Sequence, residues 1–161
     1  MSEPFYRKAD TNGDGTGATI ATGNYSGAAE EFYIESTDEL RIHRLIICVT
    51  DSGAFDANEY GNSIELTNGI NIQHRDSSDN IIADYTQSGN VKTNAGWGGY
   101  CYDVDVKTWG TGPEILLARW SFDKIGGPIL LEQGHKLVFT LNDDFTGLLD
   151  HFFTLQGQDH G

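Results

Sequence analysis

The sequence predicts an all-β protein built as an antiparallel sandwich of two sheets. Almost no segment places apolar residues at the three-and-four spacing of an amphipathic helix. Short runs of β-branched and aromatic residues instead recur along the chain, separated by turn-forming clusters such as TNG, DSSDN and LNDD. Short strands at this spacing are typical of sandwiches and barrels.

The runs predict strands in chain order at 31–35, 40–50, 63–66, 70–75, 81–85, 100–106, 114–122, 129–131, 135–141 and 151–156. Successive side chains of a strand point to opposite faces, so Leu137, Phe139 and Leu141 are expected to face the core. An antiparallel sandwich without intervening helices favours a jelly roll. An immunoglobulin-like sandwich is the second choice, because Trp97 lies in a Gly-rich turn rather than in a strand between the cysteines.

The sequence LIICV, in the second half of the longest predicted strand, is apolar on both faces. A sandwich normally buries one face of a strand and leaves the other to solvent. We therefore expect the second face to be covered by another subunit or by the chain's own loop 51–62. If a subunit covers it, the contact lies around Leu45, Ile47 and Val49, or around Ile46 and Cys48 if the register is opposite.

Residues 1–29 differ in composition from residues 30–161 and are expected to form a flexible arm ahead of the sandwich domain. The arm contains DTNGDG from Asp10, which matches the opening of an EF-hand calcium loop. The twelfth position of such a loop needs a bidentate Glu, and here it is Ala21. The many glycines of this segment raise the conformational entropy that is lost when it becomes ordered, which favours a flexible arm over a cation site.

Length and charge restrict the class of protein. A chain of 161 residues fits one domain. Its formal net charge of −14 opposes binding to nucleic acid or to anionic membranes. We expect no signal peptide and no membrane span. Folding in a reducing cytoplasm fits Cys48 and Cys101 as separate thiols, with a disulfide between them as the alternative.

No arrangement of catalytic groups is apparent, so we expect neither an enzyme nor a cofactor. No two of the five histidines stand two positions apart, as a cupin-like metal site requires. The sequence LNDDFTG is expected to be a turn in which Asn142 and Asp143 cap their own backbone. No G-x-S-x-G sequence is present for a serine nucleophile.

Trp97 and Trp109 both lie in Gly-rich turns, at opposite ends of one predicted strand. A tryptophan in a loop offers a large apolar face to a sugar or to a protein partner. It can equally close the open end of a sandwich, so both interpretations stay open.

Three stretches resemble a group of small virion proteins of tailed bacteriophages. They are the region from FYIESTDELRIHRLIICVTDSG, the region VKTNAGWGGYCYDVDVKTWGTGPEILLARWSF, and LVFTLNDDFTGLLDHFFTLQG. The resemblance covers most of residues 30–157. It implies a capsid decoration, or cement, protein on the outside of the virion, with the major capsid protein as partner and a homotrimer as the assembled form.

The resemblance assigns no functional residues. For an arm that orders on assembly, the expected anchors are Phe5, Tyr6 and Ile20, with Arg7 and Lys8 reaching acidic groups. The alternative function is a receptor- or glycan-binding jelly-roll module of a head or tail fibre, using Trp97 and Trp109.

Overall fold

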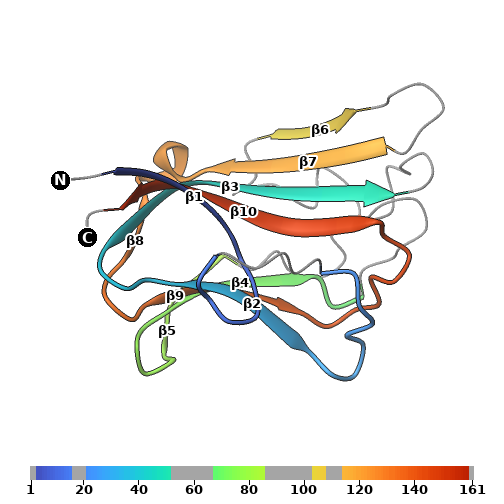
Figure 1. The fold of residues 1–161 in the computed structure, drawn as a ribbon, viewed down its shortest axis with the longest axis horizontal. Helices are drawn as coiled ribbons and strands as arrows, with labels where there is room; N and C mark the ends of the chain where they lie inside the picture. Colours follow the sequence, from blue (N-terminus) through green and yellow to red (C-terminus); the bar gives the residue numbers. More distant parts are fainter. Residues whose placement is uncertain (1–2, 16–20, 52–66, 86–102, 108–113, 160–161) are drawn as a thin grey trace.

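A computed structural model describes residues 3–15, 21–51, 67–85, 103–107 and 114–159 of the chain. Its strands form two antiparallel sheets stacked as a sandwich (Figure 1). The only helical segment among these residues is the short 3₁₀ turn η2 (Phe122–Ile125). Within the same ranges, no helix is long and apolar enough to cross a membrane. The prediction of an all-β two-sheet sandwich is confirmed.

The larger sheet has six strands. In spatial order they are β1 (Glu3–Lys8), β10 (Asp150–Asp159), β3 (Leu40–Asp51), β7 (Glu114–Ser121) and β6 (Asp103–Lys107), with β8 (Ile129–Leu131) also paired to β3. The smaller sheet contains β2 (Glu30–Glu35), β9 (Lys136–Leu141), β4 (Ile70–Arg75) and β5 (Ile81–Asp84), in that order. Nine of these strands match predicted ones, and the predicted strand 63–66 lies outside the described residues.

The core lies between the two sheets and follows the predicted alternation. Leu137, Phe139 and Leu141 of β9 are fully buried. The ring of Phe139 stacks on that of Phe153 from β10, with centroids 4.5 Å apart. This contact joins the two layers directly, because β9 and β10 belong to different sheets.

The prediction of a separate arm over residues 1–29 is wrong for the described residues 3–15 and 21–29. All six residues of β1 pair with β10, from Glu3 opposite Asp159 to Lys8 opposite Thr154. Ala9 and Ala21 are buried in the core at 2% and 1% exposure. The physical reason is that β10 would otherwise be the edge of the larger sheet, and β1 satisfies the backbone N–H and C=O groups on the side of β10 away from β3. Backbone pairing of this kind leaves little trace in side-chain composition.

Candidate contact surface

The outer face of the six-stranded sheet carries apolar side chains at its centre. On β3, Ile46 and Cys48 are half-buried and alternate with fully buried residues that face the core. Register places Phe152 of β10 opposite Cys48 and Thr154 opposite Ile46, so all four lie on the outer face. We call Ile46, Cys48 and Phe152 the outer apolar cluster.

The predicted subunit contact at Leu45, Ile47 and Val49 is wrong. These side chains are 1%, 0% and 0% exposed and belong to the core between the sheets. The opposite register holds, and it leaves Ile46 and Cys48 on the outside. Alternation shows which residues share a face, but a strand that is apolar on both sides gives no signal for which face is inside.

Strand β1 borders the outer apolar cluster. The ammonium group of Lys8 lies 4.3 Å from the centre of the Phe152 ring, a cation–π contact. Tyr6 pairs with Gln156 across the ladder and is 61% exposed. Phe5 instead packs against the core. Arg7 forms an ion pair with Asp159 at 3.2 Å.

Of the residues predicted to anchor an arm, Phe5 and Arg7 are therefore engaged within this chain, whereas Tyr6 and Lys8 reach the outer face. The other predicted site residues, Ile20, Trp97 and Trp109, lie outside the described residues.

Charges of both signs surround the outer apolar cluster. Arg44, which pairs with Gln156 on this face, is exposed, and no ion pair involving it occurs among the described residues. Asp150, half-buried, lies at the end of β10. Burial and then Asp150 raise the pKa of the Cys48 thiol, while Lys8 lowers it. At neutral pH Cys48 therefore stays a protonated thiol, which is a poor nucleophile and metal ligand.

The calcium-like sequence at Asp10 forms a capped turn. The Asp10 Oδ1 atom accepts hydrogen bonds from the backbone N–H groups of Asn12 at 3.2 Å and Gly13 at 2.6 Å. Asp10 also pairs with Tyr33 of β2 through an isolated bridge. This carboxylate therefore shapes the turn beside β2, and Gly13 is needed there because a Cβ atom would overlap the Tyr33 ring.

Asp143 has a role that the sequence did not indicate. Its carboxylate is buried and accepts N–H groups from Thr67, Asn68 and Gly69, at 3.1 to 3.2 Å. It thus caps a segment more than seventy residues away. The cap of the local turn is Asp144, which accepts from both the N–H and the hydroxyl of Thr146. Only the tertiary fold brings residues 67–69 to Asp143, so no local pattern could reveal this contact.

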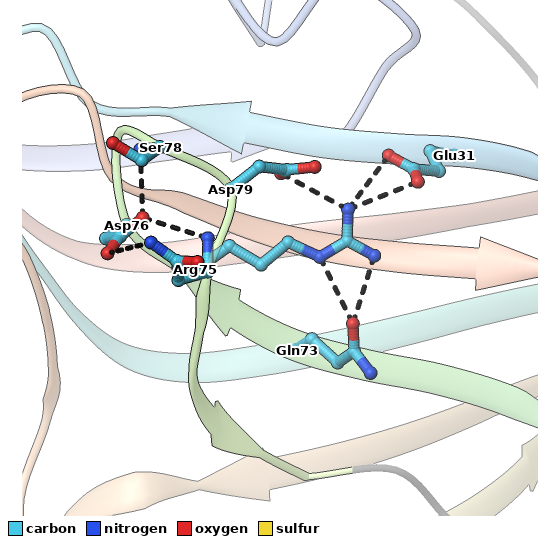
Figure 2. A network of polar contacts seen from close by, with 7 residues as sticks. Glu31, Gln73, Arg75, Asp76, Ser78 and Asp79 are labelled. Atoms are coloured by element: carbon cyan, nitrogen blue, oxygen red, sulfur yellow. Dashed lines mark hydrogen bonds and ion pairs between the residues drawn. The ribbon is translucent and has the colours of Figure 1, made fainter.

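A polar network covers the outer face of the smaller sheet (Figure 2). Arg75 of β4 reaches Glu31 of β2 at 3.2 Å and Asp79 at 3.4 Å, and donates twice to Gln73 at 3.0 and 3.1 Å. Since β9 lies between β2 and β4, the guanidinium group spans a whole strand. Val138, the outward residue of β9 beside Gln73 in register, is fully buried. The network fastens the β4–β5 hairpin across the sheet.

The described histidines do not gather at one place. On the larger sheet, His43 Nδ1 lies 3.0 Å from both carboxylate oxygens of Asp123. On the smaller sheet, His74 is hydrogen-bonded to His135. His151 is buried and bonded to the Ala21 carbonyl. Within the described ranges, no group of three or more His, Cys, Asp or Glu residues is arranged to hold a metal ion.

Comparison with known proteins gives no relative: no family model, no curated protein and no solved structure matches this chain.

Proposed function

We propose that this protein is a structural protein of a phage virion, namely a head decoration (cement) protein on the capsid exterior. It binds the major capsid protein and associates with copies of itself as a homotrimer. The observation that carries the proposal is the outer apolar cluster on the larger sheet, taken with the sequence resemblance to small virion proteins.

The outer apolar cluster favours a protein contact. Ile46, Cys48 and Phe152 lie on the two central strands β3 and β10, where a sheet facing only solvent would carry polar side chains. Apolar surface gains about 25 cal/mol per Å² when it leaves water. Covering this face with another chain is therefore favourable.

We assign a second copy of this chain to that face. The rim carries Lys8 and Arg44 together with Asp150, so opposite charges are available on the same surface. Two copies of the chain can therefore face each other through this surface without bringing only like charges together. Rim charges contribute little affinity, so the apolar cluster supplies most of it.

The pairing pattern supports a jelly roll as the finer fold. The first strand pairs with the last, β2 pairs with β9, β3 pairs with β7 and β8, and β4 pairs with β5. This nesting is what results when a long hairpin is wrapped into two sheets, as in jelly rolls.

The glycan-binding alternative depends on Trp97 and Trp109. Both lie outside the described residues, and nothing in the described part of the chain favours that function.

The virion assignment is tested on particles. An antibody raised against the recombinant chain is used to probe density-purified phage particles from the source culture. We expect the chain to copurify with the particles in copies comparable to the capsid subunits, and cryo-electron microscopy to place it at threefold positions. A chain found only in the soluble fraction, with bare particles, would overturn the assignment.

The self-contact is tested by substitution. Ile46→Lys places a charge in the outer apolar cluster, and Ile82→Lys places the same charge on β5, where Ile82 is 50% exposed. We expect sedimentation velocity to give a trimer for the wild type and Ile82→Lys, and a folded monomer for Ile46→Lys. A monomeric wild type at high protein concentration, or an Ile46→Lys protein that remains trimeric, contradicts the contact.

A further inference from the structure

Two histidines are hydrogen-bonded to each other at one end of the sandwich. His74 lies on the inner face of β4 and is 7% exposed. Its Nε2 atom is 3.0 Å from Nδ1 of His135, which precedes β9. The other nitrogen of His135, Nε2, lies 3.8 Å from the carboxylate of Glu132. His74 is thus buried, the His135 side chain is 14% exposed, and each ring has an ionisable neighbour.

The pair anchors the two connections that cross between the sheets at this end (Figure 1). Residues 132–135 lead from β8 in the larger sheet to β9 in the smaller, and residues 36–39 lead from β2 back to β3. These crossover turns are bonded to each other: Ser36 N–H donates to His135 O at 2.9 Å, and Gly134 N–H donates to Ser36 O at 2.8 Å. The His74 bond ties both turns to β4.

The crossover turns also lie against the tip of the β4–β5 hairpin. A Cβ atom added to Gly134 would stand only 3.0 Å from the Cβ of Ser77. The hairpin tip is in turn closed by Asp76, whose carboxylate accepts the N–H groups of Ser78 and Asn80, both at 2.9 Å. Three loops therefore meet at the histidine pair.

The hydrogen bond between the rings survives one added proton but not two. With both rings neutral, one nitrogen donates and the other accepts. With one proton added to the pair, one ring is charged and donates an N–H while the other ring stays neutral and accepts it, so the bond is kept. A second proton, on His74, leaves two N–H donors facing each other and two positive charges in contact. The second proton therefore breaks the bond.

The groups facing the pair determine the pH at which the hydrogen bond between the rings is lost. Burial, and after it the charge of His135, lowers the pKa of His74 below its ordinary value of 6.5, while Glu132 and Asp76 act in the opposite direction. The bond is thus retained at neutral pH and is lost as pH falls through the lowered pKa of His74.

We propose that the His74–His135 pair is an acid-sensitive clamp: its second protonation releases the two crossover turns from the β4–β5 hairpin and opens this end of the sandwich, while the strand ladders stay paired. The proposal is independent of the proposed virion function.

The test is amide hydrogen exchange followed by NMR on the full chain between pH 7 and pH 5, corrected for intrinsic exchange rates. The amides of Ser36 and Gly134 report the clamp, and the amide of Val138 within the β9 ladder reports wider opening. We expect exchange at Ser36 and Gly134 to rise about tenfold or more relative to Val138 as the pH falls. His135→Gln keeps a polar side chain that does not titrate, so this relative rise should disappear.

His43→Gln is the matched control, because His43 lies on β3 of the larger sheet and pairs with Asp123, not with the clamp. It should keep the relative rise at Ser36 and Gly134. An unchanged rise in His135→Gln, or equal acceleration of all three amides in the wild type, would overturn the clamp. If His135→Gln does not fold, the test is NMR titration of the imidazole signals in the wild-type protein. Coupled titration of His74 and His135, with one step below pH 6.5, would support the clamp. Two independent ordinary titrations would refute the clamp.

Discussion

His151 is a fully buried ionisable residue, at 0% exposure. Its ring packs between Phe145 and Phe153, at centroid distances of 4.8 and 5.0 Å. Its Nδ1–H donates to the Ala21 carbonyl at 2.8 Å. Burial lowers the pKa of His151 to about 4, against a smaller opposing effect of that hydrogen bond. The folded protein therefore holds this ring neutral at physiological pH.

Acid should weaken the fold through His151. Between pH 6.5 and about 4 the unfolded chain binds a proton that the folded chain does not, so the free energy of unfolding falls as pH falls through this window. The loss attributable to His151 is about 3 kcal/mol when complete. Urea unfolding at a series of pH values measures it.

The control is His151→Asn, whose amide can still donate to Ala21 but does not titrate. We expect it to be less stable than the wild type at pH 7 and to show a flatter dependence of unfolding free energy on pH. A pH dependence equal to that of the wild type would mean that other groups cause the acid loss.

Gly157 is required by a close backbone approach. It follows the register shift in β10, and a Cβ atom there would overlap the backbone carbonyl oxygen of Arg41. We expect Gly157→Ala to lower the free energy of unfolding by about 3 kcal/mol, because the backbone of β3 must move. Gly27→Ala is the control: Gly27, unlike Gly157, has a positive φ, but its added Cβ meets nothing, so only conformational strain of about 1 kcal/mol is expected. Equal losses in the two variants would contradict the steric explanation.

At the scale of elements, β1 is an integral edge strand of the larger sheet. It pairs with β10 along its whole length, and Phe5 packs against the core. The N- and C-terminal strands thus lie side by side (Figure 1). Strand β1 therefore contributes both backbone pairing and core packing to the sandwich.

Removing residues 1–8 should therefore destabilise the free protein. The loss includes part of the burial of Phe5, about 1 kcal/mol, and the backbone hydrogen bonds to β10, each about 1 kcal/mol. We expect a melting temperature several degrees lower by calorimetry. Tyr6→Ala, at an exposed position of the same strand, should change it little. A truncated protein with wild-type stability would restore the interpretation of this segment as an arm.

At the scale of the whole molecule, net charge opposes self-association. Each chain carries a formal charge of −14, so the three copies of the proposed trimer would repel one another, whereas contact through the outer apolar cluster would be favourable. Salt screens the repulsion and leaves the apolar attraction in place. We expect sedimentation equilibrium to show tighter association as salt rises from about 0.05 M to about 0.3 M. Association that weakens over this range would indicate a contact held by ion pairs.

The sequence alone determined the fold class, nine of the described strands and the side-chain alternation within them. These features depend on local chemistry: β-branched and aromatic runs, the turn residues between them, and the period of two. Leu137, Phe139 and Leu141 were placed in the core for this reason, and they are buried there.

Only the tertiary structure decided what depends on residues distant in sequence. It made β1 a strand through backbone pairing with β10, turned Leu45, Ile47 and Val49 inward, and set Asp143 over residues 67–69. It also joined His74 to His135 across sixty-one residues. The local sequence does not show which strand a backbone will pair with, nor which face of a strand that is apolar on both sides will be buried. These contacts are therefore decided only when the two sheets pack together.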